Sequence, residues 1–234
     1  EVILTENERV RRFGFLASEL DREKKDMLTM MGKMAKEADK TESASYADEY
    51  LRNFLEKEPI PGIQKEYEIT RDFLPGITLD EINQIGKEWI SDDNIVSLIT
   101  AQEKEGIKVP TESQVLDIIK SVKGMKIEAY SEKVSDAPLL SVPPSPVLVT
   151  KRSENVQFGY TELNFGNGVR MILKPTDFKN DEILISAYSP GGTSLYPDND
   201  IMSAMLASTI VTQSGVGNYD YMGLQKKLSG YTAK

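Results

Sequence analysis

The 234-residue sequence contains no cysteine and no histidine, and these two absences exclude several common catalytic chemistries. Without cysteine the chain can neither form a disulfide nor use a thiol as a nucleophile, which fits cytoplasm and periplasm equally. Without histidine it can supply neither the base of a serine-type triad nor the imidazole ligands of a typical zinc site. An active centre made of these residues alone is therefore not expected.

The sequence also lacks an 18-residue apolar run and a signal peptide. Its net charge is −9, with 20 basic and 29 acidic residues in positions 1–150 and 8 of each in positions 151–234. An acidic surface repels phosphate backbones and anionic lipid headgroups, so we expect no nucleic-acid partner and no membrane insertion. The hydrophobic content of 39% is enough for a globular core.

Capping boxes predict the starts of three helices, namely Thr5 with Glu8, Thr78 with Glu81, and Thr111 with Gln114. The first would be one long helix over residues 5–38, whose apolar stripe is interrupted at Lys24. This stripe is either a coiled-coil seam or the buried side of a helix on a sheet. Its Ala- and Met-rich composition favours the second interpretation, a helix packed on a sheet. The other two would end near Trp89 and Val122, and a further helix is predicted over Ile63–Phe73.

The content of β-branched residues predicts strands over Ile95–Thr100, Val169–Lys174 and Ile183–Tyr188. A tight Asn-Gly turn between Phe165 and Val169 should precede the second of these strands. The predicted helix Ile201–Val211 is apolar on nearly all sides, which is typical of a helix buried in the middle of a domain.

Residues 137–146, APLLSVPPSP, include four prolines and should behave as a semi-rigid spacer. A ligand for an SH3-like domain is the functional alternative. We interpret residues 138–146 as a linker between residues 1–137 and residues 147–234.

Three motifs with a superficial functional resemblance are better explained as ordinary turns. Asp198-Asn199-Asp200 lacks the glutamate at the twelfth position of a calcium loop. Gly215-Val216-Gly217 lacks the lysine of a phosphate loop, and Ser214 lacks both the preceding glycine of a nucleophile elbow and an activating histidine.

Two stretches of the sequence resemble the pitrilysin/insulinase family of zinc metallopeptidases. One is the strand, Asn-Gly turn, paired strands and GGTSLYPDNDIMSAMLASTIVTQSG of residues 164–230. The other is EYLRNFLEKEPIPGIQKEYEITRDFLPGITLDEIN, which is similar to the helical part of large bacterial tandem forms. The resemblance implies an α+β fold in which helices pack on antiparallel-rich mixed sheets, with the end of one domain followed by the start of the next.

The catalytic helix of that family carries HxxEH, in which two His bind zinc and the Glu activates the bound water. The resemblance places Met205 and Thr209 at the His positions and Ser208 at the Glu position. A thioether and two neutral hydroxyls cannot perform these roles. We therefore expect no catalytic, cofactor-binding or metal-binding residue in this chain, with zinc held by a catalytic domain of the parent protein.

Taken together, these observations predict an internal, non-catalytic segment of a zinc metallopeptidase that helps to enclose the substrate. Its expected partners are the other domains of the same polypeptide and, in the parent, a peptide substrate. A structural, assembly or peptide-binding role with a fully inactive peptidase fold is the alternative. The isolated segment could dimerise through uncovered strand edges, and the bacterial forms that it resembles suggest a periplasmic or cell-envelope setting.

Overall fold

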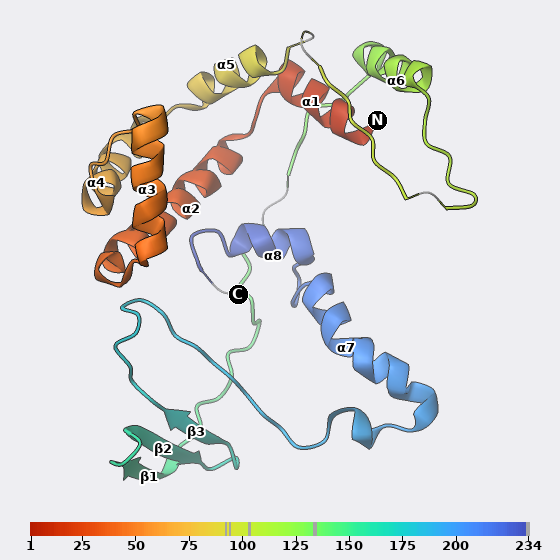
Figure 1. The fold of residues 1–234 in the computed structure, drawn as a ribbon. Coiled ribbons are helices and arrows are strands. Elements are labelled where there is room, and N and C mark those ends of the chain that lie inside the picture. Colours follow the sequence, from red (N-terminus) through yellow and green to blue (C-terminus); the bar gives the residue numbers. More distant parts are fainter. Residues whose placement is uncertain (92, 94, 103, 133–134, 233–234) are drawn as a thin grey trace. The chain divides into compact units, whose positions relative to one another are not determined.

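The computed structural model describes residues 1–91, 93, 95–102, 104–132 and 135–232. The described part has an α+β composition, as predicted, with eight α-helices and one small antiparallel sheet (Figure 1). The chain divides into two units, one formed by residues 1–26 and 71–133 and the other by residues 27–70 and 134–234. The predicted linker and the domain boundaries at residues 137 and 147 stay predictions.

The first unit is organised around helix α1 (Val2–Phe13), which contacts both α5 (Leu79–Trp89) and α6 (Glu112–Gly124). Arg12 of α1 donates from Nη1 to the carbonyl oxygen of Met125 and from Nη2 to that of Lys123, both at 2.8 Å. Because the last carbonyls of a helix lack partners within it, a guanidinium at this end satisfies them and favourably meets the helix dipole. One side chain thus secures the end of α6 to α1.

The predicted long helix over residues 5–38 is wrong, because α1 ends at Phe13 and α2 spans Ala17–Lys36. Gly14 has φ 75° and ψ −170°, a left-handed conformation that glycine adopts without a Cβ clash. The following amide of Phe15 donates to Asn83 Oδ1 at 2.7 Å, so a side chain of α5 stabilises the break. Heptad spacing alone could not reveal this tertiary contact.

Two further residues of the predicted long helix, Thr5 and Lys24, are explained by their hydrogen bonds. The Thr5–Glu8 capping box does not form, because the helix already begins at Val2 and Thr5 Oγ1 donates to the carbonyl oxygen of Glu1 at 3.1 Å. Lys24 interrupts the stripe because its Nζ donates to the carbonyl oxygens of Pro75 at 3.1 Å and Ile77 at 2.6 Å.

The remaining capping boxes are confirmed at the first residues of α5 and α6. Thr78 Oγ1 accepts from the amide of Glu81 at 3.3 Å, while the Thr78 amide donates to Glu81 Oε2 at 2.7 Å. Thr111 and Gln114 form the same reciprocal pair. Helix α4 is also confirmed, with the predicted bounds Ile63–Phe73. These starts depend on contacts within four residues, which explains why the sequence predicts them.

The second unit contains the C-terminal part of α2, helix α3 (Ser43–Glu56) and most of α4, followed by a three-stranded antiparallel sheet. Its strands are β1 (Val149–Asn155), β2 (Tyr160–Phe165) and β3 (Arg170–Leu173), hydrogen-bonded in the order β1-β2-β3. The predicted Asn-Gly turn is confirmed between β2 and β3, where the amide of Phe165 donates to the carbonyl oxygen of Val169 at 2.9 Å. Strand β3 itself confirms the core of the predicted strand over residues 169–174.

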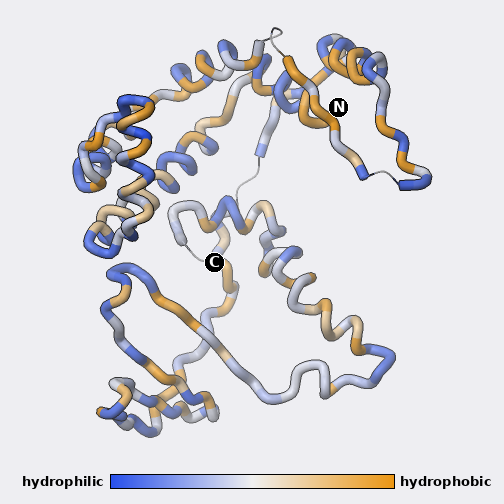
Figure 2. The backbone as a smooth tube through the Cα atoms, viewed as in Figure 1, coloured by the Kyte–Doolittle hydropathy of each residue, from blue (hydrophilic) through white to orange (hydrophobic). Residues whose placement is uncertain are grey.

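Two predicted strands are absent from the described residues. Residues 95–100 and 183–188 have no strand pairing, and their hydrophobic side chains are exposed, for example Val96 and Tyr188, each at 91%. A strand requires hydrogen bonds from a neighbouring strand, and none is supplied to either segment by the described part of the chain. Figure 2 shows the hydrophobic character that prompted both predictions.

The chain ends with two short helices of the second unit, α7 (Ile201–Ser214) and α8 (Tyr221–Lys227), which contact each other. Buried hydrophobic side chains are few in the described residues, and they are Ala35, Leu74, Val122, Ile127 and Tyr219. None of the helices in the described residues has the length and hydropathy of a membrane span.

We expect Gly14→Ala to lower the free energy of unfolding by about 2 kcal/mol, because an L-residue is strained at this φ. A Cβ there would also meet the side-chain amide of Asn83 at 2.6 Å. The matched control is Gly124→Ala on α6, where nothing lies within 4 Å of the added Cβ, and it should gain about 0.5 kcal/mol. Urea unfolding followed by circular dichroism measures both, and equal effects would contradict the assignment of Gly14 as the helix break.

We expect the contribution of Glu8 to stability to depend on pH. Its buried carboxylate pairs at 2.6 Å with Arg11 and Arg12, and the hydrogen bond from Arg11 is the main cause of its lowered pKa. A lowered pKa in the folded state gives stability that is present above the unfolded value and lost as pH falls through the folded value. The difference in stability between the parent and Glu8→Gln should thus be largest near neutral pH and shrink below about pH 4.

Urea unfolding at a series of pH values tests this expectation. Glu23→Gln on the exposed side of α2 is the control. A Glu8→Gln difference that stays constant from neutral to acidic pH would show that the ion pairs are not its source.

Candidate functional site

The three positions that the family resemblance places at HxxEH lie together on α7. Met205, Ser208 and Thr209 are separated by three and four residues, so they share one side of the helix. All three are exposed. The backbone carbonyls of Ser208 and Thr209 accept from Thr212 Oγ1 at 3.1 and 2.9 Å. Their correspondence to the zinc motif stays a prediction.

The chemistry of this side of α7 is that of a packing helix. Its groups are a thioether and hydroxyls, which provide neither a carboxylate nor an imidazole. Across the described residues, no three side chains of His, Cys, Asp or Glu gather in a way that could hold a metal ion. Just before the helix, Gly191 has φ 118°, and Ser194 Oγ donates to its carbonyl oxygen at 2.9 Å. This glycine loop therefore shapes the backbone ahead of α7.

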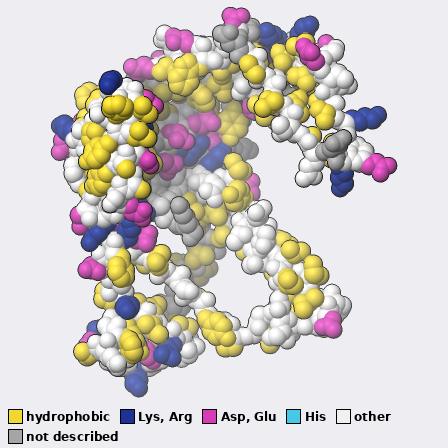
Figure 3. All heavy atoms as spheres, in the orientation of Figure 1, with side chains coloured by type: hydrophobic (Ala, Val, Ile, Leu, Met, Phe, Trp, Pro, Cys, Tyr) yellow, Lys and Arg dark blue, Asp and Glu magenta, His cyan; other side chains and the backbone are white. Residues whose placement is uncertain are grey.

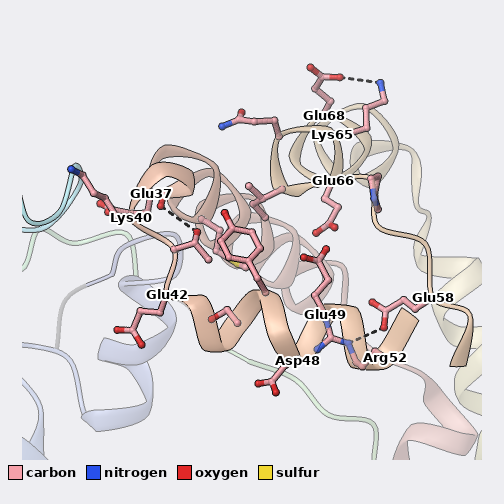
Figure 4. Close-up of a pocket in the computed structure, with 18 of the residues that line it drawn as sticks. Glu37, Lys40, Glu42, Asp48, Glu49, Arg52, Glu58, Lys65, Glu66 and Glu68 are labelled. Atoms are coloured by element: carbon pink, nitrogen blue, oxygen red, sulfur yellow. Dashed lines mark hydrogen bonds and ion pairs between the residues drawn. The ribbon is translucent and has the colours of Figure 1, made fainter. Parts of the chain in front are cut away.

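The described structure contains a groove of about 980 Å³. It lies within the second unit, where the end of α2 and the helices α3 and α4 meet (Figure 4). Sequence reasoning missed it. The signal was the PIPG turn of residues 59–62 between two helices that both carry acidic residues, but which faces of these helices meet is a tertiary property.

The lining of this groove is predominantly acidic, with seven carboxylates and four basic side chains. Two of the carboxylates are paired, Glu58 with Arg52 at 2.8 Å and Glu68 with Lys65 at 3.0 Å. The hydrogen bond to Glu58 raises the pKa of Arg52. The described structure gives no hydrogen bond or ion pair to the side chains of four others, which are Glu42, Asp48, Glu49 and Glu66.

Glu37 forms the buried part of the groove wall, with only 9% of its surface exposed. Its Oε1 accepts from the backbone amides of Asn180 at 2.7 Å and Asp181 at 2.5 Å. Its Oε2 is buried and has no hydrogen-bond partner among the described residues. A buried acceptor without a partner is costly, because it has lost its hydration without compensation.

No family model matches this chain. The chain is similar to a protein of Arabidopsis thaliana described as zinc protease PQQL-like, with 29% identity over 212 residues. This similarity covers 90% of the chain but 22% of the relative, so the chain spans about a fifth of the length of that protein.

Two solved structures are also similar over 97% of this chain and 25% of their own chains. The periplasmic protease PqqL from Escherichia coli gives a TM-score of 0.49 at 18% identity. A mutant of the ferredoxin protease FusC, in complex with Arabidopsis ferredoxin, gives 0.48 at 16% identity.

Proposed function

Because this chain belongs to the pitrilysin-like zinc protease family, we propose that it is a non-catalytic segment of a larger zinc metallopeptidase. In this proposal residues 1–137 close one pitrilysin-like domain, residues 138–146 are a linker, and residues 147–234 open a degenerate following domain. Zinc would be held by another domain of the same polypeptide, where it would supply the activated water for peptide-bond hydrolysis.

The absence of histidine is the observation that carries this proposal. Zinc peptidases with the inverted motif need two imidazole ligands and a glutamate on one helix. The corresponding helix here is α7, which carries Met205, Ser208 and Thr209 instead. A non-catalytic repeat is expected to belong to the family and to be unable to form the motif, and this chain meets both expectations.

Exposed hydrophobic surface supports a role inside a larger assembly of domains. Helix α7 is apolar on most sides, and Met202, Met205 and Val211 are each at least 60% exposed. Figure 3 shows hydrophobic side chains at the surface over this helix. A hydrophobic face of this kind favours burial against a partner. The other domains of the same polypeptide are the partners that we propose, since the related protein is much longer than this chain.

In the proposed arrangement the segment contributes to the wall of a chamber that encloses extended peptides. Its contribution is shape, closure and exclusion of unsuitable substrates. The chemistry requires none of its side chains, so its surface substitutions should change turnover only through the fit between domains.

The complete polypeptide that carries these residues provides the test, with bound zinc and peptide hydrolysis measured separately. Met205→Ala, Ser208→Ala and Thr209→Ala, combined, should leave the zinc content unchanged by elemental analysis, because none of the three is a ligand. Loss of zinc in this variant would contradict the proposal.

A second variant tests the exposed apolar face of α7 that we propose a neighbouring domain covers. Met205→Glu with Ile210→Glu should lower the rate of peptide hydrolysis about tenfold or more, because burying two charges disrupts a domain contact, while zinc remains bound. Gln157→Glu with Thr176→Glu adds the same charge at exposed polar positions and is the control. Unchanged turnover in the α7 variant would refute a role in the chamber. A complete polypeptide with neither zinc nor hydrolytic activity would instead support the assembly or peptide-binding alternative.

A further inference from the structure

We propose that the groove between α3 and α4 binds a peptide segment rich in lysine and arginine. The proposal concerns binding only, and it holds whether or not the parent protein is a peptidase. All residues that line the groove belong to the second unit.

Apart from Glu37, the carboxylates of the groove lie on or beside the two helices α3 and α4. On α3, Ser45, Glu49 and Arg52 recur at intervals of four and three residues, which places them on one side of the helix. Glu66 of α4 lies across from them, and in Figure 4 the side chains of Glu49 and Glu66 point toward one another. Both are half-buried, and the described structure gives no ion pair to either of them, although the charge of Glu49 also acts on Arg52 of the same helix. Like charges that face each other repel, and an intervening cation would remove that repulsion.

Glu37 adds a buried negative charge to the wall of the groove. Its Oε2 is a buried acceptor in the groove wall that lacks a donor, as described above. The two amides at Asn180 and Asp181 hold the other oxygen, so the carboxylate is fixed in place before a ligand arrives. At the accessible carboxylates of Glu49 and Glu66, a lysine ammonium or arginine guanidinium supplies N–H donors and opposite charge at once, which is the strong form of hydrogen bond.

The shape and lining of the groove favour a peptide over a single ion. Its carboxylates are distributed over two helices and the end of a third, and no three of them in the described residues converge to hold a metal ion. Its wall also includes Met34, Pro61 and Ile63. Lysine and arginine lay aliphatic stems along apolar surface while their charged ends reach polar groups. A volume of about 980 Å³ accommodates several such side chains.

The test is fluorescence anisotropy of a labelled hexalysine peptide with the complete polypeptide at physiological ionic strength, with EDTA present so that hydrolysis does not consume the probe. Glu49→Gln combined with Glu66→Gln should weaken binding about tenfold, because two charge-assisted contacts are lost. Glu37→Gln alone, which keeps an acceptor for the two amides, should weaken it severalfold. Circular dichroism establishes that each variant is folded.

The matched control is Glu23→Gln combined with Glu56→Gln, which removes the same charge from exposed positions of α2 and α3 outside the groove. Its affinity should stay within about twofold of the parent. Equal weakening in both double variants would show that hexalysine is attracted only by the net charge of −9 and would overturn the proposal. Absence of binding to the parent protein would overturn it as well.

Discussion

Burial of apolar surface is the main favourable contribution to folding, and the described residues of this chain bury little of it among themselves. Among the residues that the structure describes, five hydrophobic side chains are buried and no large side chain is completely enclosed. Polar contacts therefore have an unusually large share in defining the local structure. Arg12 secures the end of α6, Asn83 stabilises the break at Gly14, and the carboxylate of Glu37 fixes the backbone at Asn180.

The small amount of buried apolar surface also connects the fold to the proposed function. Helix α7 and the extended residues 183–188 expose apolar side chains that a larger assembly of domains would cover. The proposed role as a non-catalytic segment requires surfaces of this kind, since such a segment would pack against neighbouring domains. The acidic groove is different, because charged side chains make up much of its lining. The two proposals therefore rest on different surfaces of the chain, the packing role on α7 and peptide binding on the groove.

Local interactions made some elements predictable. The capping boxes at Thr78 and Thr111, the bounds of α4 and the Asn-Gly turn before β3 all depend on residues within a few positions of one another. The segments Ile95–Thr100 and Ile183–Tyr188 were predicted as strands from composition. Composition reports a preference for the extended conformation, whereas a strand also needs a hydrogen-bonding neighbour. Helix α7 was predicted from the sequence for the same local reasons as α4. The groove was not predicted from the sequence.

The sequence by itself determined that this chain cannot form an HxxEH zinc site, because no arrangement in space can replace a missing imidazole. It also determined the family resemblance and the helix starts, which depend on residue types and short spacings. Only the tertiary structure decided where the first long helix breaks, because Asn83 is distant in sequence from Gly14. It likewise decided that the carboxylates of α3 and α4 line one groove and that an oxygen of Glu37 is buried without a donor, since the meeting of two helix faces depends on contacts between distant residues.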